Sequence, residues 1–219
     1  MYLYNIHTHK LPSGEGDYTE KCILSTSPQE YIDLVEYSQN VWYSCGIHPW
    51  YAANADSQIA LLEKIALDKR IIAIGEAGLD KLKGADLNVQ IEVFRKNIEL
   101  AIRLGKPLIV HCVKAWDELI SLRKEYGDQV PWIIHGYRGN AEQTKQFDKQ
   151  GFKFSIGEYF NEESVKNIPI ESLFCETDTL DVSICNVYGR LCEVLEMDIE
   201  QFDLNIRENI EKIFSEMTK

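Results

Sequence analysis

The chain has 219 residues, of which 45% are hydrophobic and 26% are charged, and its 35 acidic against 23 basic residues give a formal net charge of -12. A chain of this length and composition can bury one large core, so we expect a single domain over residues 1–219. The acidic balance repels a polyanion at long range and argues against a broad nucleic-acid-binding face, but not against a phosphodiester held locally at a metal site. No signal-peptide pattern or bilayer-length apolar stretch is present, which predicts a cytoplasmic protein without membrane association.

Eight short apolar segments are typical of strands buried on both faces of a parallel sheet. In chain order they are Tyr2–Ile6, Lys21–Leu24, Val41–Ile47, Ile71–Ile74, Leu108–Val110, Trp132–Ile134, Phe152–Ile156 and Leu173–Cys175. Helical patterns occur at Pro28–Gln39, Asp56–Asp68, Val89–Leu104, Ala115–Tyr126, Asn140–Gln150 and Ile199–Met217. This alternation predicts an α/β fold, a (β/α)8 TIM barrel, and the short Gly-containing stretch from His9 to Lys21 predicts that the barrel is trimmed near its first helix.

Six residues that can bind a metal ion stand at or just after the ends of the predicted strands. They are His7, His9, Glu76, His111, His135 and Asp178. Functional sites of (β/α)8 barrels lie at the C-terminal ends of the strands, so we expect all six to converge on one face. Because alternate residues of an extended chain point the same way, His7 and His9 can reach one ion. A mixture of imidazole and carboxylate favours zinc, manganese, nickel or iron over the ions that prefer oxygen ligands alone.

A single histidine at a strand end is more often structural than metal-binding. Here four of the chain's five histidines end predicted strands together with a glutamate and an aspartate, and a shared metal site explains them better than six independent structural uses. The fifth, His48, also follows a predicted strand. The sequence leaves open whether His48 lines the substrate pocket or only orders its loop.

Six motifs follow one another along the chain at the predicted strand ends. They are Asn5-Ile6-His7-Thr8-His9, Gly46-Ile47-His48-Pro49, Gly75-Glu76-Ala77-Gly78-Leu79-Asp80, Val110-His111-Cys112, Ile134-His135-Gly136-Tyr137-Arg138-Gly139 and Glu176-Thr177-Asp178. Each motif alone is weakly specific, but together they resemble the TatD family. Its members are metal-dependent hydrolases with amidohydrolase-like barrels, and many are described as deoxyribonucleases. The resemblance extends from the first residue to Glu208-Asn209-Ile210.

The resemblance implies one or two divalent ions, with Glu76 bridging them when two are bound. His7, His9 and Asp178 would complete the shell of one ion, and His111 and His135 that of the other. It further implies hydrolysis by a water whose pKa is lowered toward neutrality by the metal, with Asp178 orienting the water and accepting its proton. Asp178 and Glu76 are therefore the catalytic candidates. The identity of the metal stays open among zinc, manganese, magnesium, nickel and iron.

Four other residues are candidates for contacts around the metal ligands. Arg138, three residues after His135, has a planar guanidinium that fits a phosphate, and His48 is the other candidate for substrate contact. We expect Asp80 either to hydrogen-bond a ligand imidazole or to shape a turn over residues 75–80. Asn5 stands where the family usually has an aspartate, so a supporting carboxylate is missing there.

Two segments that would contact substrate depart from the family pattern. Cys112-Val113 replaces the usual Ser-Arg after His111, and Thr179-Leu180-Asp181 replaces the usual Ser-Pro-Tyr after Asp178. We expect a TatD-type phosphodiesterase that acts on DNA ends or on a small anionic substrate, with no obligate protein partner. One alternative is a hydrolase of a small amide, ester or lactone. The least favoured is a non-catalytic barrel protein, because all six candidate ligands are present.

Overall fold

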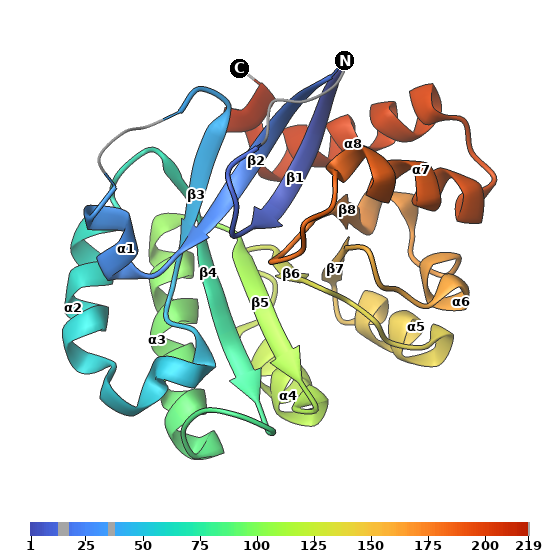
Figure 1. The fold of residues 1–219 in the computed structure, drawn as a ribbon. Helices are drawn as coiled ribbons and strands as arrows, with labels where there is room; N and C mark the ends of the chain where they lie inside the picture. The colour runs from blue at the N-terminus through green and yellow to red at the C-terminus, as the bar shows by residue number, and fades with distance from the viewer. Residues whose placement is uncertain (13–17, 35–37, 219) are drawn as a thin grey trace. The chain divides into compact units, whose positions relative to one another are not determined.

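The computed structural model describes residues 1–12, 18–34 and 38–218, in which strands and helices alternate along the chain (Figure 1). The strands are β1 (Tyr2–Thr8), β2 (Thr19–Thr26), β3 (Val41–Cys45), β4 (Ile71–Asp80), β5 (Leu108–Val113), β6 (Trp132–Ile134), β7 (Phe152–Ile156) and β8 (Leu173–Cys175). The α-helices are α1 (Pro28–Ile32), α2 (Asp56–Ile65), α3 (Leu87–Leu104), α4 (Trp116–Tyr126), α5 (Ala141–Lys149), α6 (Glu162–Val165), α7 (Ile184–Leu195) and α8 (Ile199–Ile213). Three 3-10 helices complete the set: η1 (Pro49–Asn54), η2 (Ile170–Ser172) and η3 (Ser215–Thr218).

The chain divides into two compact units, and each is described by itself. Unit 1 comprises Met1–Leu24, Gln39–Val41 and His135–Lys219, and unit 2 comprises Ser25–Ser38 and Trp42–Ile134. The single-domain organisation expected from the sequence stays a prediction.

Unit 1 is built on a parallel arrangement of β7, β8, β1 and β2. Phe154 of β7 pairs with Leu173 of β8, and Asn5 of β1 pairs with Cys22 of β2. The segment after β8 joins β1, because the backbone N–H of Asp178 donates to the His7 carbonyl at 3.0 Å. Helices α7 and α8 pack on β1 and β8 (Figure 1).

Unit 2 is built on β3, β4, β5 and β6, again with every pair parallel. Helix α3 packs along β4 (Figure 1). It begins at the N-cap Asp86, whose side chain accepts from the Asn88 backbone N–H, and it ends at Gly105, which has a φ of 64°. A left-handed glycine is a strong stop signal, and the helix predicted over residues 89–104 ends at the observed residue.

The predicted turn over residues 75–80 is wrong, because β4 continues through it to Asp80. Gly75 and Gly78, with φ of 141° and 154°, allow the strand to run close to β5. A Cβ atom on Gly78 would lie 1.9 Å from the His111 carbonyl oxygen. The glycines that suggested a turn therefore serve close strand packing.

Two helix predictions also need correction. Helix α1 ends at Ile32 instead of Gln39, although residues 35–37 of the predicted segment lie outside the described part. Helix α7 was not predicted. It begins after Ser183, whose side chain caps the Cys185 backbone N–H, and buries Val187, Tyr188 and Leu191 despite Gly189 within it. No helix occurs among residues 9–12 and 18, while residues 13–17 of the expected trimmed segment lie outside the described residues.

None of the helices in the described ranges is both long enough and apolar enough to cross a membrane. The cytoplasmic location expected from the sequence stays a prediction.

Candidate metal centre

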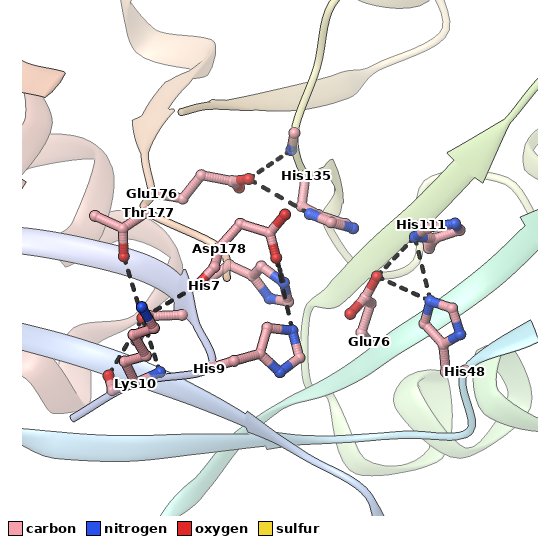
Figure 2. Close-up of polar contacts among 12 residues, drawn as sticks. His7, His9, Lys10, His48, Glu76, His111, His135, Glu176, Thr177 and Asp178 are labelled. Atoms are coloured by element: carbon pink, nitrogen blue, oxygen red, sulfur yellow. Dashed lines mark hydrogen bonds and ion pairs between the residues drawn. The ribbon is translucent and has the colours of Figure 1, made fainter. Parts of the chain in front are cut away.

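Unit 1 brings together four of the six predicted metal ligands. His7 lies in β1 and His9 directly after it, His135 follows β6, and Asp178 follows β8. The Nε2 atoms of His7 and His9 each lie 3.7 Å from Asp178 Oδ1, as Figure 2 shows. The rings of His7 and His135 lie 4.2 Å apart, and ligand atoms of His7, His135 and Asp178 are all within 4.8 Å of one another. We call these three residues the unit 1 group.

The backbone of Asp178 is held against the end of β1. Its N–H donates to the His7 carbonyl at 3.0 Å, and its carbonyl accepts from the His9 N–H at 3.0 Å. The residue has a φ of 54°, in the left-handed region that non-glycine residues rarely occupy. Such conformations persist where the surrounding structure fixes them, and they cluster at functional sites. These contacts hold the Asp178 side chain beside His7 and His9.

Glu176 is a site residue that sequence reasoning missed. It is fully buried, and its Oε1 accepts from the Gly136 backbone N–H at 2.7 Å and lies 3.4 Å from His135 Nδ1. A carboxylate behind an imidazole fixes the ring's orientation and raises its basicity toward a metal. The sequence contained one signal, namely an acidic residue directly after the apolar β8 segment, where a carboxylate requires a partner.

Unit 2 assembles His48, Glu76 and His111, which we call the unit 2 group. Glu76 lies within β4 and His111 within β5, while His48 is the N-cap of η1. Glu76 Oε1 lies 2.7 Å from His111 Nδ1 and 3.2 Å from His48 Nε2, as Figure 2 shows. All three offer ligand atoms within 4.8 Å of one another.

His48 has contacts beyond the two roles, pocket lining and loop ordering, that the sequence analysis considered. Its Nδ1 accepts from the Trp50 backbone N–H at 3.2 Å, so it does order its loop. Its Nε2 also lies 3.3 Å from His111 Nδ1. Its position among possible metal ligands makes it a ligand candidate as well as a candidate for substrate contact.

Asp80 lies behind His111. Its Oδ2 is 3.5 Å from His111 Nε2 and accepts from Trp50 Nε1 at 2.7 Å. Burial favours the neutral acid, but hydrogen bonds from the Trp50 indole and the Leu82 backbone N–H, together with His111, outweigh it and lower the pKa of Asp80. The carboxylate is thus ionised at neutral pH beside the imidazole, as expected for a group that orients a metal ligand.

Unlike Asp80, neither Asn5 nor Arg138 has a recorded contact with a candidate ligand imidazole among the described residues. Asn5 Nδ2 donates to Glu20 Oε1 at 2.7 Å and to Thr177 Oγ1 at 2.9 Å, so Asn5 supports the segment before Asp178 instead of an imidazole. Arg138 is exposed, and its guanidinium lies 5.3 Å from the centre of the Tyr159 ring.

Each group therefore has a donor set that fits a divalent ion of the zinc, manganese or iron type, because imidazole nitrogen is combined with carboxylate oxygen. The position of His135 bears on how the ligands would be divided between two ions. Unit 1 alone offers His135 to the same ion as His7 and Asp178, whereas the resemblance paired it with His111. The division of ligands between two ions stays a prediction.

Alternating strands and helices with histidine and carboxylate groups at strand ends are typical of a barrel protein with a metal site. Solved structures agree with the fold. A TatD homologue from Escherichia coli, YJJV, superposes with a TM-score of 0.83 at 21% identity, covering 97% of this chain and 98% of that one. A TatD family hydrolase from Entamoeba histolytica gives 0.78 at 18% identity, covering 97% and 98%. The predicted (β/α)8 barrel is confirmed.

The sequence comparisons give the family. The model of the TatD-related DNase family matches residues 15–215, and this chain belongs to that family. YabD of Bacillus subtilis, named a metal-dependent hydrolase, is 27% identical over 206 residues, which cover 84% of this chain and 81% of that protein. The 3'-5' ssDNA/RNA exonuclease TatD of Yersinia pseudotuberculosis is 29% identical over 154 residues, covering 65% and 59%. The resemblance inferred from the six motifs is confirmed.

Proposed function

We propose that this protein is a divalent-metal-dependent hydrolase that cleaves phosphodiester bonds at the ends of DNA. The observation that carries the proposal is the pair of His and carboxylate groups, His7/His135/Asp178 in unit 1 and His48/Glu76/His111 in unit 2. Membership of the TatD-related DNase family and the exonuclease name of the Yersinia relative support it.

The side chains divide the work of hydrolysis. A divalent ion held by these groups would supply Lewis acidity, which would lower the pKa of water and offset the negative charge of a phosphate. Each group contains only one carboxylate beside two histidines, so its direct ligands would neutralise a bound divalent ion only in part. His7 is fully buried and can serve only as a fixed ligand.

Asp178 has the properties of the proton acceptor. Its side chain is 31% exposed, so unlike His7 it can contact a water molecule while its backbone stays fixed to β1. A carboxylate within hydrogen-bond reach of the attacking water orients it and accepts its proton. The bridging role of Glu76 stays a prediction.

The test is hydrolysis of bis-p-nitrophenyl phosphate and of a short single-stranded DNA by metal-stripped protein, with manganese, magnesium or zinc then added back. We expect both activities to return with metal and to be absent from the Asp178→Asn variant. Inductively coupled plasma mass spectrometry of the same samples shows whether metal has bound.

If the protein binds metal but hydrolyses neither phosphodiester, the nuclease proposal is overturned. The acidic net charge of -12 and the missing arginine after His111 would then favour the alternative, a hydrolase of a small amide, ester or lactone. A protein that neither binds metal nor shows a metal-dependent thermal shift would favour a non-catalytic barrel.

A further inference from the structure

Two threonine hydroxyls join the chain segments that carry ligands of the unit 1 group. Thr8 stands between His7 and His9 at the end of β1, and Thr177 directly precedes Asp178. The Thr177 hydroxyl donates to Thr8 Oγ1 at 3.1 Å, and Figure 2 shows the Thr177 side chain directed toward the end of β1. Both threonines are buried, so this contact is shielded from bulk water.

The direction of each hydrogen bond at Thr8 is fixed by its neighbours. The hydroxyl proton of Thr8 is directed at backbone carbonyls, that of Lys10 at 3.2 Å and that of Asp178 at 3.4 Å. The oxygen accepts from the Lys10 backbone N–H at 3.2 Å and from the Thr177 hydroxyl at 3.1 Å. A threonine hydroxyl has one proton and two acceptor sites, so Thr177 must be the donor in the bridge between the two threonines.

Asn5 keeps Thr177 in the donating state. The Asn5 Nδ2 atom donates to Thr177 Oγ1 at 2.9 Å and to Glu20 Oε1 at 2.7 Å. The Asn5 Oδ1 atom accepts from the Thr177 backbone N–H at 3.2 Å. Because Asn5 donates to the Thr177 oxygen, the hydroxyl proton of Thr177 is left for Thr8. Asn5, Thr177 and Thr8 therefore form a buried chain of hydrogen bonds that runs in one direction and ends at backbone carbonyls.

The hydroxyl bridge lies on the side of β1 away from the ligand imidazoles. Successive side chains of a strand point to opposite faces, so the Thr8 hydroxyl faces away from His7 and His9. The bridge can therefore hold the Asp178 segment against β1 without occupying a position that a metal ligand needs.

The bridge also acts where the backbone is least favourable. Asp178 has a φ of 54°, and a left-handed non-glycine residue persists only where its surroundings fix it. On one side of this residue its own N–H and carbonyl bond to His7 and His9. Thr177 precedes it directly, so the hydroxyl bridge restrains the peptide that leads into the strained residue.

We propose that Thr8 and Thr177 are positioning residues, whose hydroxyl bridge sets the separation between His7 and the Asp178 carboxylate and thereby the affinity of the unit 1 group for a divalent ion. His7 Nε2 lies 3.7 Å from Asp178 Oδ1 while the bridge is formed. Without the bridge, the segment that carries Asp178 is restrained by backbone contacts alone. The inference deepens the proposed function by naming residues that hold its metal ligands, and it rests on that function for the metal but not for the bond that is cleaved.

The test compares metal affinity with stability in the full-length protein. Isothermal titration measures manganese binding by Thr8→Val, Thr177→Val and the double variant, since valine keeps the shape and removes the hydroxyl. A titration of His7→Ala identifies the signal of the unit 1 ion. Thr8→Ser and Thr177→Ser keep the hydroxyl. Urea unfolding of each variant gives its loss of stability.

Thr26→Val is the matched control. Thr26 is also a buried threonine at the end of a strand, and its hydroxyl donates to the Ser44 carbonyl at 3.1 Å. Both residues belong to unit 2, so the substitution removes a comparable hydrogen bond outside unit 1. We expect it to lower stability without changing the affinity for the unit 1 ion.

We expect Thr8→Val and Thr177→Val each to weaken binding of the unit 1 ion by about tenfold, the lower end of the range for groups that orient metal ligands. Binding of the other ion should not change. Either substitution breaks the same bridge, so the double variant should also lose about tenfold and not the roughly hundredfold loss that independent effects would give. The serine variants should retain the affinity of the unsubstituted protein.

An equal loss of affinity in Thr26→Val would overturn the inference, because manganese binding would then follow overall stability. Additive losses in the double variant would overturn it too, as would a unit 1 group that binds no manganese. If circular dichroism shows that a valine variant is unfolded, cysteine replaces valine at that position, since a thiol is only a weak donor and acceptor, and the same loss is expected.

Failure of the bridge and failure of the proposed function give different results. The expected loss of manganese affinity in a protein that hydrolyses neither phosphodiester would support the bridge and contradict the proposed function. Metal-dependent hydrolysis of both phosphodiesters, with unchanged manganese affinity in the valine variants, would contradict the bridge alone.

Discussion

The unit 1 and unit 2 groups use the same kinds of ligand but are spaced differently. In unit 1 the imidazole nitrogens of His7 and His9 lie 3.7 Å from the Asp178 carboxylate, too far to hydrogen-bond to it. In unit 2 the Glu76 carboxylate lies 2.7 Å from His111 and 3.2 Å from His48. Donors placed 2.0 to 2.1 Å from a tetrahedral zinc ion lie about 3.4 Å apart. The unit 1 spacing is therefore close to that of a metal shell, whereas Glu76 Oε1 and His111 Nδ1 lie closer together than two ligands of one ion do.

The two groups are held in place by different kinds of contact. The backbone of Asp178 is positioned by hydrogen bonds to β1. Glu76 and His111 instead hold each other, with Asp80 and Trp50 behind them.

The largest expected effect tests Asp178 as the proton acceptor. Asp178→Asn keeps the backbone contacts and removes the negative charge, so we expect turnover of a phosphodiester to fall by about a thousandfold, within the range for general-base loss. The control is Asp181→Asn, since this aspartate lies in the same loop with a side chain that is 98% exposed. Steady-state hydrolysis of bis-p-nitrophenyl phosphate measures both, and a similar fall in the two variants would contradict the assignment.

Metal stoichiometry tests whether the two groups bind separately. We expect His7→Ala to lose the ion of the unit 1 group and His111→Ala that of the unit 2 group, because each substitution removes a direct ligand. The loss of metal affinity in each variant should exceed the roughly 10- to 100-fold loss that removal of a supporting group causes. Isothermal titration with manganese should give two equivalents for the unsubstituted protein and one for each variant. Loss of both ions from either variant would mean that the groups do not bind independently.

A smaller effect is expected from the carboxylate behind the unit 2 group. Asp80→Asn preserves the shape but removes the charge beside His111, so we expect manganese affinity of the unit 2 ion to fall by about tenfold. Affinity of the unit 1 ion should not change. Asp117→Asn, at an exposed position of α4 in the same unit, controls for the loss of one negative charge. Equal losses in the two variants would show that Asp80 acts only through net charge.

The strands and the six candidate ligands could be predicted because they follow local rules. Buried parallel strands are continuous apolar segments, and functional groups of this fold follow them, so β6, β7 and β8 were placed at their observed bounds. Gly105 likewise defined the end of α3. These features depend on neighbours in sequence and can be inferred from one chain.

What could not be predicted depends on contacts between distant segments. Gly75 and Gly78 looked like turn residues because their role, close approach of β4 to β5, involves residues some 30 positions away. Glu176 gained its role only when β8 met the segment after β6, where Gly136 and His135 lie. The pairing of Trp50 with Asp80 is equally non-local. Supporting contacts of a site therefore require the structure, even where candidate ligands can be named from the sequence.

The smallest expected effect concerns Asn5, the amide that stands in unit 1 where the family usually has an aspartate. Burial raises the pKa of Glu20, and the hydrogen bond from the Asn5 amide partly offsets this. Asn5→Asp removes that hydrogen bond and places a second carboxylate beside Glu20, so the pKa of Glu20 should rise further. Because the charged form is then disfavoured in the folded state, the penalty is present above the folded pKa and is relieved as the pH falls toward the unfolded value of about 4. We expect the free energy of unfolding in urea to fall by about 1 kcal/mol at pH 7, the worth of one hydrogen bond, and by less at pH 4.

Asn5→Ala, which loses the hydrogen bond without adding charge, should show a weaker dependence on pH. An equal pH dependence of the two variants would show that the amide acts only as a hydrogen-bond donor, and that a carboxylate at position 5 adds no electrostatic penalty of its own.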